Sequence, residues 1–276
     1  MAYCTVDGVR VWYEVSGKGP PLALIGGFAL IDSQWEFCVD ELRKHHTVIN
    51  YAFRGTGKSD WTSTTPPCLE HYVEDLRAVL DAAGIPKTAI WCTSTGAPIG
   101  IRFAAKYPER MTALVTYPWF KSDDTWRGVM QTAYMTAKHY GIGAMSRLFA
   151  GAVFPPELLY AKEGTEYEQW AKKVYERNVN PTTLQKVIEA YCEVDLTGDV
   201  PRIQCPTMLL MGKDSALNEQ EAMKEVSFEY LMSTFRALKP DVETGIIEGA
   251  GSTYCMVTKP KACAETAMAF LARVVK

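Results

Sequence analysis

The chain has 276 residues, of which 47% are hydrophobic and 22% are charged, and its formal net charge is −3. These values are typical of a globular protein with an ample buried core, and they argue against the strongly basic balance of proteins that bind nucleic acids or anionic membranes. The eight cysteines form no CxxC pair and the four histidines show no zinc-site spacing, so we expect reduced thiols and no metal site.

The amino-terminal residues lack the basic segment and apolar run of a signal peptide. No stretch approaches the roughly 20 consecutive apolar residues that cross a bilayer. The sequence therefore predicts a soluble, cytoplasmic protein with a small-molecule substrate and with no membrane or nucleic-acid partner. A homodimer is compatible with these properties.

Short apolar runs alternate with helical patterns through the first 117 residues. A weakly alternating run at 9–15, followed by a turn at 17–20, predicts a hairpin strand. Continuous apolar runs predict buried parallel strands at 22–25, 47–52, 88–92 and 111–117. Apolar residues at helical spacing predict helices at 68–83 and 97–106.

The alternation stops between residues 118 and 197, a stretch that is helical in pattern and rich in aromatic residues. It resumes with strands at 207–211 and 242–247 and helices near 219–238 and at 260–274. Such alternation predicts a doubly wound, mostly parallel α/β sheet. We therefore expect an α/β core formed by residues 1–117 and 198–276, with a helical cap at 118–197.

The segment Cys92-Thr93-Ser94-Thr95-Gly96 lies between a predicted strand and a predicted helix. It matches the Gly-x-Ser-x-Gly nucleophile elbow, with cysteine in place of the first glycine. Such an elbow exposes the serine hydroxyl at the carboxyl end of the sheet, in front of a helix N-terminus that favours developing negative charge. Ser94 is therefore the candidate nucleophile, and an ordinary loop serine is the alternative.

Together with the elbow, the segments at 53–60 (FRGTGKSD) and 248–251 (EGAG) resemble the α/β-hydrolase superfamily. The resemblance covers nearly the whole chain and is to the capped branch of esterases, lactonases, C–C hydrolases and cofactor-free haloperoxidases. It implies an α/β-hydrolase fold with the helical cap inserted after the sixth strand. It also implies an oxyanion hole formed by the backbone N–H groups of Phe28 and Thr95.

The same resemblance raises a problem with the acid and the base of the catalytic triad. Asp214 follows a predicted strand one residue earlier than the family's acid, so a surface aspartate is the alternative. Ser252 stands where the family has its triad histidine, after Gly249-Ala250-Gly251. A serine hydroxyl cannot take a proton from Ser94 near neutral pH. His139, in the predicted cap, can substitute only if it points into the pocket; a structural role is its alternative.

Aromatic residues of the predicted cap indicate an apolar pocket for an uncharged or lipophilic molecule. The candidate substrate-binding residues are Trp119, Tyr134, His139 and Tyr254. The alternative is that many cap aromatics only hold the cap on the core. No Rossmann fingerprint is present, so we expect no nucleotide cofactor, and no other cofactor is indicated.

Three functions stay open at this stage. The first is an enzyme acting on an ester, lactone or acylated natural product, with Ser94, Asp214 and Ser252 as an atypical triad. The second is a lyase or cyclase of natural-product biosynthesis, which eliminates an acyl or acetate group or decarboxylates its substrate. The third is a ligand-binding protein without turnover, a situation that resembles the plant gibberellin receptor, a hydrolase fold that lost its histidine.

Overall fold

The computed structural model describes residues 2–60, 67–214 and 227–275. These residues form a sheet of eight strands in the order β1-β2-β4-β3-β5-β6-β7-β8. The first two pairs in this order, β1 with β2 and β2 with β4, are antiparallel, and the other five pairs are parallel. The strands are β1 (Ala2–Val6), β2 (Val9–Gly17), β3 (Pro21–Ile25), β4 (Thr47–Ala52), β5 (Thr88–Cys92), β6 (Met111–Thr116), β7 (Thr207–Gly212) and β8 (Glu243–Ile247). The predicted α/β architecture is confirmed.

The hairpin at the amino terminus differs from the prediction. The strand expected at 9–15 is present as β2, but it pairs with β1 through a turn at Asp7 and Gly8. Both turn residues have positive φ angles, 50° and 78°, as the tight Asp-Gly hairpin turn requires. The turn at 17–20 leads instead to β3, which pairs with β4 and β5. The Asp-Gly pair was the sequence signal for this hairpin.

Helices cover both faces of the sheet, because successive side chains of each buried strand point to opposite faces. On β3, Leu22 and Leu24 pack in one apolar cluster with α1 (Val39–His45) and α11 (Pro260–Val274). Its residues Ala23 and Ile25 pack in the other cluster, which the next three helices share. These helices are α2 (Leu69–Ala82), α3 (Ala97–Lys106) and α9 (Phe228–Leu238). The sheet is therefore doubly wound.

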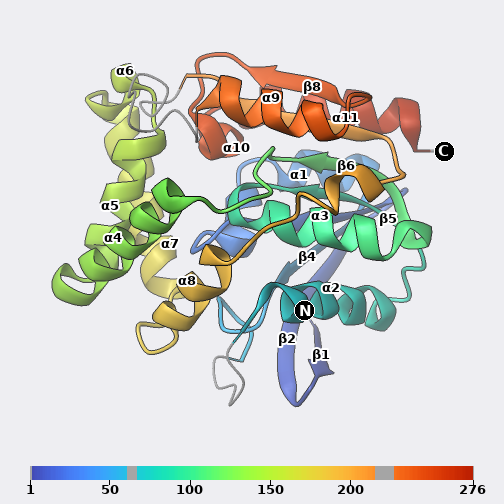
Figure 1. The fold of residues 1–276 in the computed structure, drawn as a ribbon, viewed down its shortest axis with the longest axis horizontal. Coiled ribbons are helices and arrows are strands. Elements are labelled where there is room, and N and C mark those ends of the chain that lie inside the picture. The colour runs from blue at the N-terminus through green and yellow to red at the C-terminus, as the bar shows by residue number, and fades with distance from the viewer. Residues whose placement is uncertain (1, 61–66, 215–226, 276) are drawn as a thin grey trace.

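Helices also fill the stretch between β6 and β7. They are α4 (Asp124–Tyr140), α5 (Ile142–Val153), α6 (Pro156–Leu159), α7 (Lys162–Asn178) and α8 (Leu184–Cys192). Figure 1 shows them gathered at one end of the molecule, at the left of the view. Residues Met130, Ala133 and Ala137 of α4 are buried at helical spacing. The inward side of α4 is therefore set by its apolar pattern.

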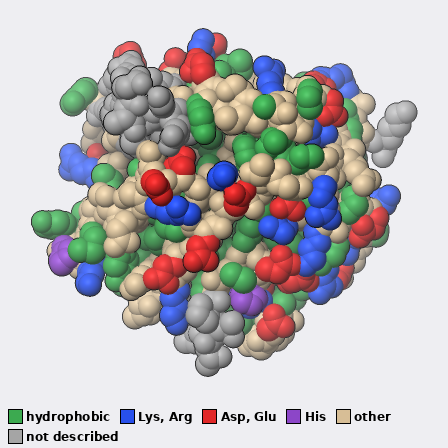
Figure 2. All heavy atoms as spheres, viewed as in Figure 1, with side chains coloured by type: hydrophobic (Ala, Val, Ile, Leu, Met, Phe, Trp, Pro, Cys, Tyr) green, Lys and Arg blue, Asp and Glu red, His purple; other side chains and the backbone are tan. Residues whose placement is uncertain are grey.

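The surface carries charges of both signs. On the face shown in Figure 2, acidic and basic side chains are interspersed. Surface ion pairs include that of Lys106 of α3 with Glu74 of α2, at 2.8 Å. Within the described ranges, no helix combines the length and hydrophobicity that a membrane span requires.

Candidate active site

Ser94 occupies a tight turn between β5 and α3. Thr93 is extended, Ser94 has a φ angle of 52°, and residues 94–96 form a 3-10 turn that leads into the helix. A positive φ angle is uncommon for a residue with a side chain and is found where surrounding structure enforces it. This strand-turn-helix geometry presents the partly exposed Ser94 side chain at the carboxyl end of β5.

Close backbone contacts explain the small residues around this turn. A Cβ atom on Gly96 would lie 2.5 Å from the carbonyl oxygen of Gly26, and one on Gly27 would lie 2.6 Å from Cβ of Ser94. Cys92 fits at the first motif position because α3 has Gly100 opposite it, where a Cβ would lie 2.4 Å from the Cys92 Sγ. The cysteine therefore replaces the usual glycine without disturbing the turn.

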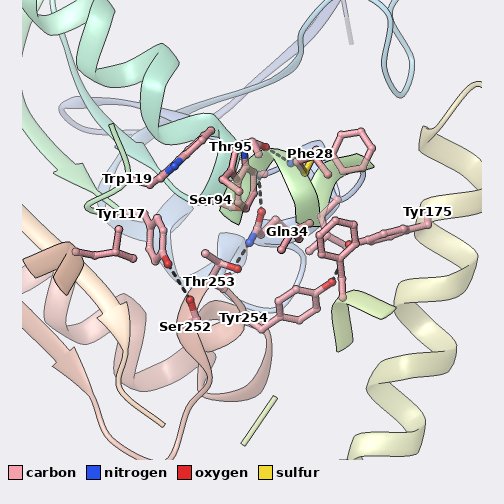
Figure 3. Close-up of a pocket in the computed structure, with 17 residues that line it drawn as sticks. Phe28, Gln34, Ser94, Thr95, Tyr117, Trp119, Tyr175, Ser252, Thr253 and Tyr254 are labelled. Atoms are coloured by element: carbon pink, nitrogen blue, oxygen red, sulfur yellow. Dashed lines mark hydrogen bonds between the residues drawn. The ribbon is translucent and has the colours of Figure 1, made fainter. Parts of the chain in front are cut away.

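The side chain of Ser94 faces a cavity of about 100 Å³ (Figure 3). The loops after β3, β5, β6 and β8 form its base, at the carboxyl edge where parallel sheets bind ligands. Helices α4, α5, α7 and α9 supply the remaining walls. The lining residues are Gly27, Phe28, Leu30, Gln34, Ser94, Thr95, Tyr117, Trp119, Trp126, Val129, Met130, Phe149, Tyr175, Leu231, Ser252, Thr253 and Tyr254.

A pair of hydroxyl groups occupies the position where the resemblance places a base. The Oγ of Ser252 lies 3.0 Å from the hydroxyl of Tyr117, which follows β6. Burial raises the pKa of Tyr117 to about 12, although the bond to Ser252 opposes part of the rise. The phenol is therefore protonated at neutral pH and can donate a hydrogen bond, but the pair offers no base for Ser94.

Gln34 joins two sides of the cavity floor. Its Oε1 accepts the N–H of Gly27 at 2.5 Å, and its Nε2 donates to the carbonyl of Thr253 at 2.9 Å. This side chain is 1% exposed and lies in the short 3-10 helix Ile31–Trp35. Gln34 thus holds the loop after β3 against the turn after β8, beside Ser94 (Figure 3).

A second hydroxyl pair links α7 to the turn after β8. The hydroxyls of Tyr175 and Tyr254 lie 3.1 Å apart, and both residues are buried (Figure 3). The ring of Phe149, from α5, lies 6.3 Å from the ring of Tyr175 and also 6.3 Å from that of Phe28. These aromatic contacts connect the helical segment to both loops that flank Ser94.

The two expected oxyanion-hole residues are brought together with Ser94. Phe28 and Thr95 both line the cavity. The N–H of Phe28, however, donates to the side-chain Oγ1 of Thr95. One of the two expected donors is therefore already engaged within the protein.

Asp214 lies beside the site and not in it. Its carboxylate accepts the N–H of Gly249 at 2.6 Å, and its own N–H donates to the carbonyl of Ala250 at 3.0 Å. It does not belong to the described lining of the cavity. Asp214 therefore supports the backbone of the turn that carries Ser252.

The four candidate substrate-binding residues divide into two pairs. Trp119 and Tyr254 line the cavity. Tyr134 does not, because its hydroxyl bonds to Gln185 at 3.1 Å on the outside of α4. His139 is exposed and lies against Tyr140. It follows the buried Ala137 by two residues, which turns it to the opposite side of the helix. The expectation that His139 points into the pocket is not met.

The cavity is neutral. Among the described lining residues there is no histidine, lysine, arginine, aspartate or glutamate. Hydroxyl groups, one amide and aromatic rings provide its polarity. Because an unpaired charge is expensive to bury, such a lining favours an uncharged ligand.

Tyr117 and Gln34 are among the lining residues that the sequence did not predict. Tyr117 was assigned to the end of the strand at 111–117, although β6 ends at Thr116 and the next residue reaches the ligand-binding edge. Its position directly after a parallel strand was an available signal. Gln34 gave no signal, because its role depends on contacts with a turn more than 200 residues later in the chain.

Comparisons with known proteins agree with this geometry. The family model described as the α/β-hydrolase fold matches residues 20–130. The chain is 27% identical over 218 residues to the RutD protein of Azorhizobium caulinodans, named as a carbamate hydrolase, covering 79% of this chain and 82% of that protein. A RutD protein of a Caulobacter strain is 26% identical over 221 residues, with coverages of 77% and 80%.

Solved structures share the fold at lower identity. An enol-lactonase from Burkholderia xenovorans superposes with a TM-score of 0.80 at 20% identity, covering 98% of this chain and 100% of that one. A thermophilic esterase from Thermogutta terrifontis gives a TM-score of 0.84 at 19% identity, with coverages of 99% and 97%. At these identities the likeness establishes the fold alone.

Proposed function

We propose that this chain, which has the α/β-hydrolase fold, is an enzyme that acts on an uncharged, lipophilic small molecule at Ser94. The substrate presents an ester, lactone or other acyl carbonyl to the Ser94 hydroxyl. The observation that carries this proposal is the strained turn that presents Ser94 to a cavity with no ionisable acid or base among its described lining residues except phenols. Carbamates, lactones and esters, the substrates in the names of the relatives, all contain an acyl carbonyl.

We further propose that residues 118–197 act as a cap on a core formed by residues 1–117 and 198–276. Trp126 and Met130 of α4, Phe149 of α5 and Tyr175 of α7 all line the cavity. Tyr140 and Tyr160 of the same segment are exposed, at 80% and 93%. The cap aromatics therefore divide between substrate contact and other roles.

A second candidate function is a non-hydrolytic reaction, namely elimination, cyclisation or decarboxylation in natural-product biosynthesis. The pairing of Ser252 with the protonated Tyr117 favours it. Hydroxyl donors can polarise a carbonyl without an acyl-enzyme, so such a reaction does not require Ser94 to be activated as a nucleophile. A ligand-binding protein is the third candidate, and recovery of a tightly bound ligand unchanged would identify it.

The test compares wild type, Ser94→Ala and Ser252→His on short p-nitrophenyl esters and aliphatic lactones in oxygen-18 water. Hydrolysis through Ser94 predicts loss of turnover in Ser94→Ala, label in the acid product, and a gain of roughly 10² in kcat for Ser252→His. Ser233→Ala, on the exposed side of α9, is the matched control and should behave as wild type.

Two outcomes separate the candidates. Turnover that survives in Ser94→Ala would rule out a covalent role for this serine. Product that carries no oxygen-18, from a substrate that loses its acyl group, would assign the reaction to elimination.

A further inference from the structure

The expected oxyanion hole contains a hydroxyl of the protein itself. The N–H of Phe28 donates to Oγ1 of Thr95, although this N–H is one of two donors expected to stabilise a substrate oxyanion. A backbone N–H has a single proton to donate. A substrate oxygen that approaches Ser94 must therefore compete with the Thr95 hydroxyl for the same donor.

The Thr95 side chain is enclosed on its other sides. It is 1% exposed and follows Ser94 in the turn, so its backbone position is fixed by the same geometry. Tyr191 of α8 is fully buried close by: burial raises its pKa, and the neighbouring Thr95 hydroxyl opposes part of that rise. A helix of the proposed cap thus reaches the residue that engages the oxyanion hole.

We propose that Thr95 is an internal competitor for the oxyanion hole, which weakens the stabilisation of a tetrahedral acyl-transfer intermediate and so restricts hydrolysis at Ser94. This inference rests on the proposed function, because that function places the substrate carbonyl at Ser94. Thr95 is then a residue that selects the type of reaction, acting through Phe28. The missing base and the engaged donor both disfavour acyl transfer, and they do so independently.

Three substitutions of Thr95 distinguish the effect of its hydrogen bond from the effect of its side-chain volume. Thr95→Ala removes the competitor and opens room for a substrate oxygen. Thr95→Val removes the hydrogen bond but leaves a methyl group against the N–H of Phe28, so the donor stays blocked. Thr95→Ser keeps the hydroxyl and serves as the folded reference.

Butylboronic acid is the probe, because it imitates the tetrahedral intermediate without needing turnover. The Oγ of Ser94 forms a bond to boron and releases its proton to water, which leaves a tetrahedral boronate with one negative charge. We expect Thr95→Ala to bind this probe roughly 10-fold or more tightly than wild type, since one oxyanion-hole donor is typically worth 10² to 10³ in rate. Thr95→Val and Thr95→Ser should show no such gain.

Ester turnover in the Ser252→His background supplies the kinetic counterpart. There we expect Thr95→Ala to raise kcat with little change in KM, since the donor acts on the intermediate and not on the bound ester. Equal butylboronic acid affinities in wild type and Thr95→Ala would overturn the inference. If no variant hydrolyses any ester, the hydrolytic function fails while the boronate comparison still decides the role of Thr95.

Amide hydrogen exchange in the wild-type protein tests the same contact without depending on whether the variants fold. With nitrogen-15 phenylalanine, the amide proton of Phe28 should exchange slowly in the free enzyme, because it is bonded to Thr95. Exchange at the rate of an unprotected loop amide would show that the contact is absent in solution, and would overturn the inference.

Discussion

Gly27 determines how closely the loop after β3 can approach Ser94. An added Cβ would lie 2.6 Å from Cβ of Ser94 and 2.9 Å from its Oγ. Such distances are shorter than any normal contact, so a larger residue must displace either the loop or the serine. The space beside the hydroxyl, which the substrate carbonyl is proposed to use, thus depends on the absence of one methyl group.

We therefore expect Gly27→Ala to lower Ser94-dependent turnover by about 10² or more, because small displacements of reacting groups are costly. The free energy of unfolding should fall by only about 1 to 3 kcal/mol, as overpacking usually gives. Kinetics on the best ester and urea denaturation measure the two effects.

Gly128→Ala is the matched control for this change. A Cβ on Gly128, in α4, would meet nothing within 4 Å, so the variant should gain about 0.5 to 1 kcal/mol from helix propensity and keep its activity. Equal turnover in Gly27→Ala and Gly128→Ala would contradict the proposed use of this space.

At this scale the sequence predicts what is local. The turn around Ser94 follows from five adjacent residues and the strand and helix beside them, and the cavity was expected at their junction. Gln34 contacts Thr253 only through the fold, so no local motif predicts it, whereas Tyr117 could have been predicted from its position after a parallel strand. His139 was misplaced because the buried side of α4 is set by Met130 and Ala137, and His139 lies two residues beyond Ala137, on the opposite side of the helix.

The end of α7 is the element that fixes the loop after β3. The side chain of Asn178, 2% exposed, donates to the carbonyls of Ala29 at 3.0 Å and Leu30 at 2.9 Å. In this loop Ala29 and Ile31 have φ angles of 64° and 51°. Since such angles persist only where the surroundings enforce them, α7 helps to hold the strained loop that carries Phe28.

Asn178→Ala removes the side-chain donor from both carbonyls, and the carbonyl of Leu30 then keeps only the N–H of Ser33. We expect the free energy of unfolding to fall by about 1 to 3 kcal/mol and turnover to fall by about 10-fold, as the loop relaxes. Asn180→Ala is the control, because the side chain of Asn180 bonds, among the described residues, only to Thr182 in the following turn. If both variants lose activity equally, the loop is not held by α7.

Elements are where the sequence was most informative. Parallel strands appear as continuous apolar runs, and β4 and β5 match their predicted bounds. β1 was missed because its burial alternates at the edge of the sheet, between intermediate and exposed positions. The predicted helix near 219–238 is found as α9 from Phe228 onward, and residues 219–226 lie outside the described part of the chain.

The described part of the protein contains several buried tyrosine and cysteine side chains that are protonated at neutral pH. Burial raises the pKa of Tyr117 and Tyr254 to about 12, from an ordinary value of 10, and that of Cys38 and Cys92 to about 12, from 9. A pKa that is higher in the folded state favours folding below the unfolded-state value. That contribution is lost as the pH rises toward the folded-state value.

Stability should therefore be level up to about pH 9 and then decline steeply toward pH 12. Each tyrosine whose pKa rises by two units contributes about 3 kcal/mol to this decline, a large fraction of the total for a typical domain. Urea denaturation across this range, with tyrosinate absorbance followed in parallel, measures it. Tyr117→Phe should make the decline shallower, and an equally steep decline in wild type and Tyr117→Phe would contradict the prediction.

The supports of the turn after β8 have a consequence for how this protein can be altered. Gln34 holds the carbonyl of Thr253, and Asp214 holds the N–H of Gly249 and the carbonyl of Ala250. All three contacts are to backbone atoms, whereas the side chain of Ser252 bonds to Tyr117. The backbone contacts that hold the turn therefore do not involve the side chain at position 252. Substitutions at position 252 should therefore change the chemistry at Ser94 without changing the fold of the turn.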